Sequence, residues 1–440
     1  MRLTPPLTLV LALAAPCSLA GGFDAFTPLV GDPKAGSLSE AAPFALSSPR
    51  FQQRSIAQRD PRDKSRFDSG RWDMLTVNET GPDAGRFLFT VFETRQAGIQ
   101  RTDLRTLETT TIWHSPSAAP ASDSHRAFDA ARWTPWGGLL TGEEAWGAAS
   151  PYGRLFELVN PLAAPADIVV RHRAILPRVA HEGLAFDRRG NLYFVDEHHG
   201  SHVFRYTSAR PNAASGDEYF AAGQTFVLRV GDGRTDEATG AGAWIPLTRR
   251  DGTPLPGTVT VVDVNGLVAI DGRATPKRDA FRGTGFGRPE DLDVRTLHDD
   301  RQLLFFTATS HHKVFSIDLA SDTVSLFASR ETPDMATGAP VGRAFTNPDN
   351  LAIDAAGNVY IVEDQPGGRA DIWFALDRDG DGVAEAIGKW ASLTTAGAEP
   401  TGLYFHPFQP DIAFVNVQHP ASGVDRTIML RVEAYSSENR

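Results

Sequence analysis

Acidic side chains recur at one position of a repeated segment of the sequence. Just before their first apolar run, four copies of this segment carry Glu182, Glu290, Asp349 and Thr401, of which the first three are acidic. If the copies form a ring, these side chains meet at one mouth, where like charges repel strongly unless a cation compensates them. Calcium takes about six to eight oxygen ligands, which suits such a ring. The repeat therefore predicts a metal site, with calcium as the expected ion.

Other polar side chains could extend this site. Glu143 and Glu144 form a pair in the turn after Thr141, and a second acidic pair, Glu363 and Asp364, follows a later apolar run. The candidate metal ligands are Glu143, Glu144, Glu182, Glu290, Asp349 and Asn350. The alternative is that each acid only caps a turn and accepts backbone N–H bonds. Because several of these acids occupy equivalent positions of the repeat, a shared metal site is the favoured interpretation for the group of residues as a whole.

A second cation signal is the acidic segment 377–382. Asp377, Asp379 and Asp381 alternate with other residues there, as at the start of an Asp-rich calcium loop. The glutamate expected at the twelfth position is replaced by Gly388, and Glu385 could substitute for it. The segment therefore predicts either a structural calcium loop or a plain polar hairpin turn.

The repeated segments themselves predict the fold. Each is a strand, a tight turn that contains Gly-Asn or Asp, and a second strand, as in 181–196 and 348–364. Strand units that recur at tens of residues, with almost no helical pattern, favour an all-β propeller, and about six blades fit. We expect a single propeller domain over 85–435 with an insertion at about 207–280. An irregular N-terminal strap is expected over 21–84.

Bulk properties narrow the partners and the compartment. The formal net charge of -11 argues against nucleic acid and anionic membranes, because no basic stripe is present. Residues 1–20 resemble a cleavable export signal, so we expect a periplasmic or secreted protein without a membrane anchor. The single cysteine, Cys17, lies inside that signal, so the mature chain has no thiolate ligand. A monomer that acts on a small molecule is expected.

Five motifs in this order resemble the PhoX-type alkaline phosphatases over roughly residues 85–420. They are Thr141–Glu144, His181–Gly183, Arg288–Asp291, Asn347–Asn350 and Asn416–Pro420. Members of that family are exported propellers that hydrolyse phosphate monoesters with a cluster of iron and calcium. The resemblance implies a small-molecule phosphate ester as the substrate.

The resemblance also assigns roles to residues. It implies that Glu182, Glu290 and either Glu143 or Glu144 are metal ligands, and that Asp349 and Asn350 approach the cluster. It implies that Arg288 holds the substrate phosphate, which guanidinium geometry allows, so Arg288 and Glu290 are the candidate catalytic residues. The family motif usually reads Thr-Cys-Glu-Glu, with the cysteine as an iron ligand. Here Gly142 takes that position, so calcium alone, or another metal without iron, is the alternative cofactor.

Two other functions fit the same pattern. Calcium-dependent lactonases and esterases also place Glu, Asp and Asn side chains around calcium, and this sequence could supply Glu182, Asp349 and Asn350. A non-catalytic binding propeller, in which cations only stiffen the blades, is the third hypothesis. Arg288 distinguishes the first from the second, because a lactone needs no anion-binding side chain. The histidines His198 and His199 are expected in surface loops.

Overall fold

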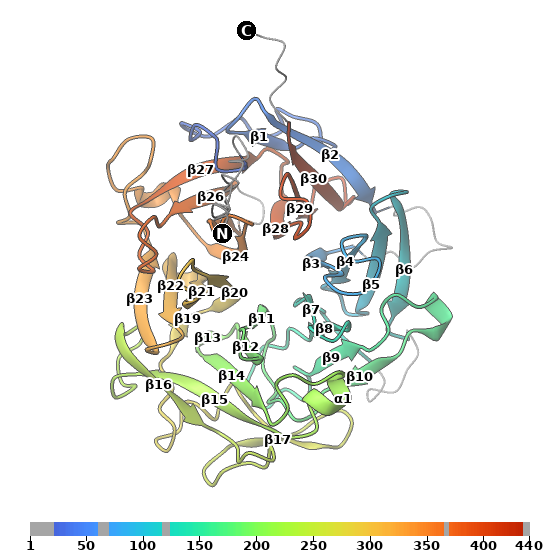
Figure 1. The fold of residues 1–440 in the computed structure, drawn as a ribbon, viewed down its shortest axis with the longest axis vertical. Helices are drawn as coiled ribbons and strands as arrows, with labels where there is room; N and C mark the ends of the chain where they lie inside the picture. The colour runs from blue at the N-terminus through green and yellow to red at the C-terminus, as the bar shows by residue number, and fades with distance from the viewer. Residues whose placement is uncertain (1–21, 60–69, 117–123, 365–368, 434–440) are drawn as a thin grey trace, which may run out of the picture.

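The chain forms a ring of β-sheets around a central axis (Figure 1), and we call the region along this axis, between the innermost strands, the central channel. The computed structural model describes residues 22–59, 70–116, 124–364 and 369–433. In each blade the strands follow one another outward from the channel and pair antiparallel with their neighbours. The all-β propeller with six blades that the sequence predicts is confirmed.

The first two blades are separate four-stranded sheets. The first contains β3 (Trp72–Val77), β4 (Phe87–Phe92), β5 (Gly98–Asp103) and β6 (Glu108–His114). The second contains β7 (Arg132–Trp133), β8 (Leu139–Gly142), β9 (Leu155–Leu158) and β10 (Val170–His172), with a short 3-10 helix at Pro165–Asp167.

The third and fourth blades join through their outer strands into one sheet, because β16 pairs with β23. The third contains β11 (Leu184–Phe186), β12 (Asn191–Val195), β14 (Val203–Ser208), β15 (Gly223–Val230) and β16 (Gly240–Pro246). The fourth contains β20 (Pro289–Thr296), β21 (Gln302–Ala308), β22 (Lys313–Asp318) and β23 (Thr323–Ala328). Short 3-10 helices lie at Thr309–His311 and Gly342–Ala344.

The last two blades take strands from both ends of the chain. The fifth contains β24 (Pro348–Ile353), β25 (Val359–Glu363), β26 (Ala370–Leu376) and β27 (Ala386–Leu393), with β1 (Phe44–Leu46) at its outer edge. The sixth contains β28 (Glu399–Phe405), β29 (Ile412–Gln418), β30 (Arg426–Val432) and β2 (Phe51–Gln58). The pairing of β2 with β30 closes the ring by joining the two ends of the chain.

This closure corrects the expected boundaries. The segment 21–84 supplies β1, β2 and the innermost strand of the first blade, so the sheets begin well before residue 85. The sequence around β3 lacks the Gly-Asn turn of the clear repeats, so the repeat alone does not predict that the first blade begins there. The expected export signal lies outside the described residues. Within the described part of the chain, no helix has the length and apolar character needed to cross a membrane.

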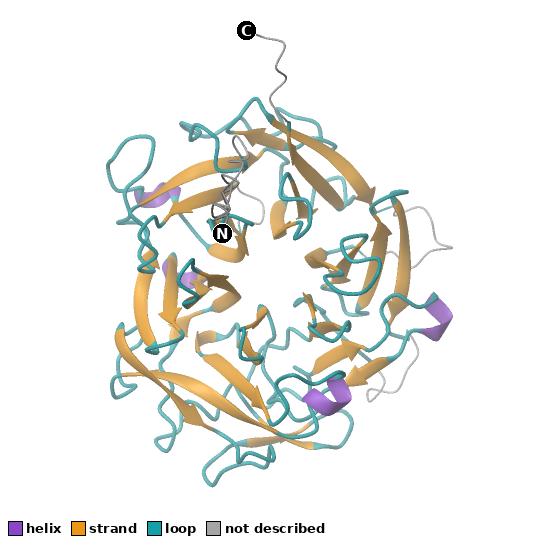
Figure 2. Cartoon of the chain, in the orientation of Figure 1, coloured by secondary structure: helices purple, strands orange, loops and turns teal. Residues whose placement is uncertain are grey.

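The insertion at 207–280 is partly regular structure. It contains α1 (Gly216–Tyr219), the outer strands β15 and β16, and the hairpin of β17 (Thr260–Val262) and β18 (Val268–Ile270). Just outside it, β13 (His199–Ser201) pairs with β19 (Phe286–Gly287). Among the described residues, helix α1 and the 3-10 helix at Pro165–Asp167 lie at the outside of the ring, whereas the turn at Thr309–His311 lies closer to its centre (Figure 2).

The turn chemistry of the repeat explains why its strands are so regular. In one copy the Asp187 carboxylate accepts the backbone N–H of Asn191 at 2.8 Å, and in the other Asp354 accepts that of Asn358 at 2.9 Å. A glycine with positive φ precedes each asparagine, as this tight turn requires. The strands on either side bury apolar side chains between neighbouring blades.

Candidate functional site

One polar position repeats at the channel mouth where the innermost strands begin. In blade order it holds Asp73, Asp129, Glu182, Glu290, Asp349 and Thr401. Asp349 is half-buried and the others are buried. Five of the six positions are thus acidic, and Asp73 and Asp129 add to the three acids that the repeat predicts.

A second ring of carboxylates comes from the ends of the second strands. It consists of Glu93, Glu144, Glu197 and Asp364. The pairing register makes Glu93, Glu144 and Asp364 equivalent, because the residue before each one faces the start of an innermost strand. The corresponding residue of the sixth blade is Gln418, whose side-chain amide donates to Asp73 at 3.0 Å.

Three blades carry an acidic pair at this point, and its two members point in opposite directions because side chains alternate along a strand. The first member lies inside the blade. Asp196 accepts the N–H of Ala180 at 2.8 Å, and Glu363 accepts the indole N–H of Trp373 at 2.9 Å. The second member, Glu197 or Asp364, lies at the mouth, where its charge acts on neighbouring carboxyl groups.

Glu143 is the first member of such a pair, and the structure does not bring it to the mouth. Its side chain is fully buried and accepts from the Arg154 guanidinium at 2.7 and 2.9 Å. It also accepts the backbone N–H of Gly153 at 3.1 Å. These bonds use both carboxylate oxygens, so Glu143 is a buried structural anion and Glu144 is the residue of this pair at the mouth.

Glu143→Gln should therefore lower stability rather than metal content. Arg154 would become a buried cation without its anion, which costs about 3 kcal/mol or more of unfolding free energy. Urea denaturation of the variant and the wild type measures this difference. A variant of wild-type stability that has lost bound calcium would instead make Glu143 a metal ligand.

The mouth carboxylates fall into two groups whose oxygens approach closely enough to share an ion. One group is Asp73, Asp129 and Glu182, and the other is Glu182, Glu197 and Glu290. In each group the ligand atoms lie within 4.8 Å of one another, and Glu182 belongs to both. The buried oxygens Asp129 Oδ1 and Glu197 Oε2 lack a hydrogen-bond partner. Buried, unpaired anionic oxygens of this kind fit calcium.

Ionising all of these carboxyl groups together is unfavourable, and their raised pKa values show this. Burial, together with neighbouring carboxylates, raises the pKa of Asp73 to about 7. Burial also raises the pKa of Glu290 to about 8, although Arg288 opposes the rise. The pKa values of Asp129 and Glu182 lie well above the usual range for the same reason of burial. A bound cation would offset this repulsion and hold the carboxyl groups in their ionised form.

Arg288 lies beside the second group. Its Nη2 lies 2.6 Å from Glu290 Oε1 and 2.8 Å from Glu197 Oε1, and its side chain remains partly exposed. The backbone at Arg288 is left-handed, with a φ of 55°, as it is at Asn347 and Arg71, which also directly precede innermost strands. Such conformations are costly for non-glycine residues and gather at functional sites. The structure thus places the Arg288 guanidinium next to two carboxylates of the mouth.

The remaining two candidate ligands differ from one another. Asp349 lies at the mouth, and burial and the charge of Glu290 raise its pKa well above the usual range. The amide oxygen of Asn350 accepts from Gly402 N at 2.7 Å and lies 2.9 Å from Thr401 Oγ1. Asn350 therefore links the fifth and sixth blades, and its side-chain oxygen is already used.

The position of the family's cysteine offers no room for a thiolate. A Cβ atom placed on Gly142 would lie 2.3 Å from His181 Cβ, so the imidazole fills that space. His181 is completely buried, and burial lowers its pKa to about 3. The described residues contain no cysteine. This part of the chain therefore does not fit an iron–thiolate centre, while its carboxylates fit calcium.

The acidic loop at 377–381 lies apart from the mouth. Asp377, Asp379 and Asp381 each bring an oxygen within 4.8 Å of the others. Arg295 binds one oxygen of Asp377 at 2.9 Å, and the other oxygen is buried without a hydrogen-bond partner. Glu385 accepts the N–H of Arg378 at 3.1 Å and so closes the loop.

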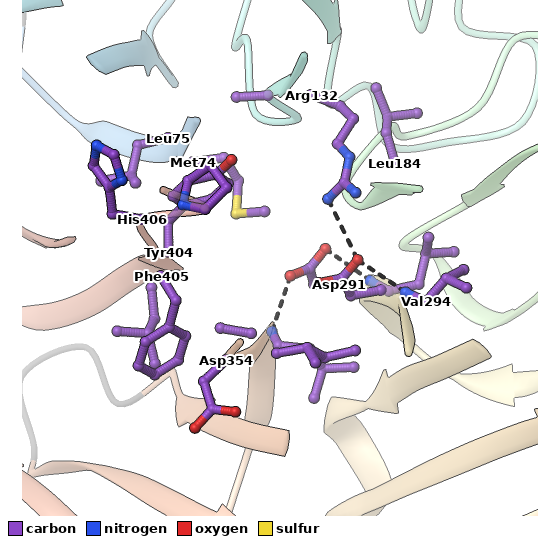
Figure 3. A pocket seen from close by; sticks show the side chains of 18 of the residues that line it. Met74, Leu75, Arg132, Leu184, Asp291, Val294, Asp354, Tyr404, Phe405 and His406 are labelled. Carbon is purple, nitrogen blue, oxygen red and sulfur yellow. Dashed lines mark hydrogen bonds and ion pairs between the residues drawn. The ribbon is translucent and has the colours of Figure 1, made fainter. Parts of the chain in front are cut away.

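The opposite mouth of the channel holds a cavity of about 330 Å³ (Figure 3). Arg132 and Asp293 form an ion pair of 3.3 Å there, and Tyr404 donates to Glu79 at 2.7 Å. Asp291, which follows Glu290 in the sequence, points to this side and accepts the N–H of Leu351 at 2.9 Å. The polar side chains of this end bind one another, in contrast to the unpaired oxygens at the acidic mouth.

Comparison with known proteins decides the family. The family described as "Alkaline phosphatase PhoX" matches residues 130–421, about two thirds of the chain. The chain belongs to the PhoX alkaline phosphatase family. The match confirms the resemblance inferred from the five motifs and supports a hydrolase of the phosphatase type. It includes every candidate residue of the PhoX-type site except Asp73, Glu93 and Asp129. A search of curated proteins finds no significant match.

Two solved structures show a distant similarity to the PhoX-type chain. A virginiamycin B lyase from Staphylococcus aureus is 12% identical, with 87% of this chain and 100% of the other covered and a TM-score of 0.43. A PQQ-bound aldose sugar dehydrogenase from Streptomyces coelicolor is 13% identical, with 87% and 98% covered and a TM-score of 0.45. At these values neither structure carries an argument about function.

Proposed function

We propose that this protein is an exported, metal-dependent hydrolase of phosphate esters. The main support is the contact of Arg288 with Glu197 and Glu290. These two glutamates form a potential metal group with Glu182, which also belongs to the second group. The chain is moreover a member of a phosphatase family. A phosphate ester is an anion, and an arginine at the edge of a cation site gives it a geometrically matched partner.

In this proposal the residues divide into ligands and a substrate-binding cation. Glu182, Glu290, Glu197, Asp73 and Asp129 hold the metal, with Glu144 and Asp349 beside them at the mouth. Arg288 binds and orients the phosphate. Bound metal would stabilise the charge on the phosphoryl oxygens and lower the pKa of a water molecule. Hydrolysis breaks the ester P–O bond, and water supplies the new oxygen on phosphorus.

A substrate screen with and without chelator tests the proposal. Aryl phosphates should be hydrolysed and lactones should not, and chelation should abolish the activity. Hydrolysis of lactones alone would favour the lactonase alternative, which the occupied amide oxygen of Asn350 makes less suitable. Activity on none of the compounds would favour a binding propeller.

We also propose that Asp377, Asp379 and Asp381 hold a structural calcium ion between the fourth and fifth blades. Arg295 of β20 already joins the loop to the neighbouring blade, and each of the three aspartates brings one carboxylate oxygen within 4.8 Å of the others. This ion would stiffen the contact between blades, since it would fix three side chains of one loop.

The double variant Asp379→Asn/Asp381→Asn should bind one calcium ion fewer per chain and should melt at a lower temperature in calcium. Because the loop lies outside the acidic mouth, phosphatase kcat/KM should remain within twofold of the wild type. Asp299→Asn/Asp300→Asn, in a neighbouring exposed turn, is the matched control for lost surface charge. Unchanged calcium stoichiometry in the first double variant would show that the loop is an ordinary polar turn.

A further inference from the structure

An exposed cluster of rings lies at the acidic mouth next to Arg288. Trp146 is 40% exposed, and the Arg288 guanidinium lies 5.2 Å from its ring centre. The rings of His198 and His199 lie 5.9 and 5.8 Å from the Trp146 ring. We call Trp146, His198 and His199 the ring platform. An exposed tryptophan beside charged groups commonly marks a surface that contacts a ligand.

The chain holds the ring platform in place from several sides. Trp146 donates its indole N–H to Glu144. The backbone carbonyl of Ala145, which lies between these two residues in the sequence, accepts from the guanidinium of buried Arg273 at 2.9 Å. His199 belongs to β13, which pairs with β19 directly before Arg288. Its Nδ1 lies 3.1 Å from Ser310 Oγ. The platform is therefore ordered relative to Arg288, as a specific binding surface requires.

The position of each ring follows from the strand ends that build the mouth. Trp146 lies two residues after Glu144, and His198 lies one residue after Glu197. Both rings thus extend outward from the carboxylates of the second ring. A substrate whose phosphate contacts Arg288 would place its organic group near the platform.

We propose that the ring platform binds a planar aromatic or heteroaromatic group on the phosphate ester, so that the substrates include nucleoside monophosphates. This inference rests on the proposed function. A flat ring can stack on Trp146 or on the imidazoles irrespective of its hydrogen-bonding pattern, and base–aromatic stacking changes binding by about tenfold. A sugar phosphate without a ring system of this kind would gain none of this contact.

Adenosine 5′-monophosphate and ribose 5-phosphate test the inference, because both release a primary alcohol and differ in the base. For the metal-loaded wild type, the ratio of kcat/KM for the nucleotide to that for the sugar phosphate should be about ten. In Trp146→Ala the ratio should fall to near one, and in Trp146→Phe it should stay close to the wild-type ratio. The ratio cancels any general loss caused by the contact between Trp146 and Glu144. Phe408→Ala removes an exposed aromatic ring at the opposite end of the channel and should leave the ratio at ten.

Calorimetric binding of the same two compounds separates this inference from the proposed function. Tighter binding of the nucleotide that Trp146→Ala abolishes would support the platform even if neither compound were hydrolysed, in which case the proposed phosphatase function would fail. Equal binding and equal kcat/KM in the wild type would overturn the platform. A Trp146→Ala variant with the wild-type ratio of kcat/KM for the nucleotide to that for the sugar phosphate would also overturn the platform.

Discussion

Replacing Glu182 with glutamine is expected to lower kcat/KM for an aryl phosphate by about 10²-fold or more. Glu182 is the one carboxylate shared by the two metal groups, so its loss weakens both at once. The amide keeps the shape of the side chain and removes its negative charge, and a neutral oxygen binds calcium less strongly. Metal analysis of the purified variant should therefore show less bound calcium than the wild type, together with the loss of activity.

Glu79→Gln is the matched control for this variant. Glu79 also lies at an end of the central channel, but at the opposite mouth, where it accepts from Tyr404. Its replacement should leave the calcium content and kcat/KM unchanged. A Glu182→Gln protein with wild-type metal content and wild-type activity would remove Glu182 from the centre.

Arg288→Ala is expected to lower kcat/KM by about 10²-fold while the fold is retained. The arginine is partly exposed, so its loss leaves no large cavity, but Glu197 and Glu290 lose the cation that contacts both. A charge-assisted pair with a bound phosphate oxygen would also be lost, and such pairs contribute roughly 1.5–3 kcal/mol each. Arg288→Lys should recover only part of the activity, because an ammonium group cannot bind two oxygens in a planar geometry.

Steady-state kinetics with an aryl phosphate and with inorganic phosphate as inhibitor measure the effect. Both the substrate KM and the phosphate inhibition constant should rise in Arg288→Ala. Arg188→Ala, which removes an exposed arginine paired with exposed Asp300, should leave both constants unchanged. If Arg288→Ala binds phosphate as tightly as the wild type, Arg288 has another role.

The architecture could be predicted from the sequence because two of its copies keep the same turn. The Asp-to-Asn bonds around residues 187–191 and 354–358 are the same local structure built twice, so the repeat could be recognised without a structure. The first blade could not be delimited in this way. Its innermost strand, Trp72–Val77, carries no such turn, so the sequence predicts an irregular strap there instead of a strand of the first blade.

The acids at the start of the innermost strands could be predicted only where they accompany a clear repeat. Glu182, Glu290 and Asp349 share that position, whereas Asp73 and Asp129 occupy it in blades whose sequence has diverged. The position of Glu197 at the mouth could have been predicted, because Glu197 follows the end of its strand as Asp364 does. Its side chain points to the side opposite that of Asp196, since side chains alternate along a strand. Which member of the pair Glu143 and Glu144 faces the mouth depends on Arg154, eleven residues away from Glu143, and spacing alone does not reveal that contact.

The role of Gly142 shows a different kind of limit. The sequence indicates that a thiolate is missing, but only the structure shows that the His181 ring occupies the space. A glycine beside an open cavity would have left room for another ligand. Here a buried imidazole closes the position, which directs the account toward a centre built from carboxylates.

The calcium requirement of the acidic mouth can be measured by adding calcium alone to the chelated protein and following its phosphatase activity. The carboxylate groups around Glu182 predict that chelation abolishes hydrolysis of an aryl phosphate and that calcium, without iron, restores it. Activity that survives chelation, or that returns only when iron is added, would contradict a calcium centre without a thiolate.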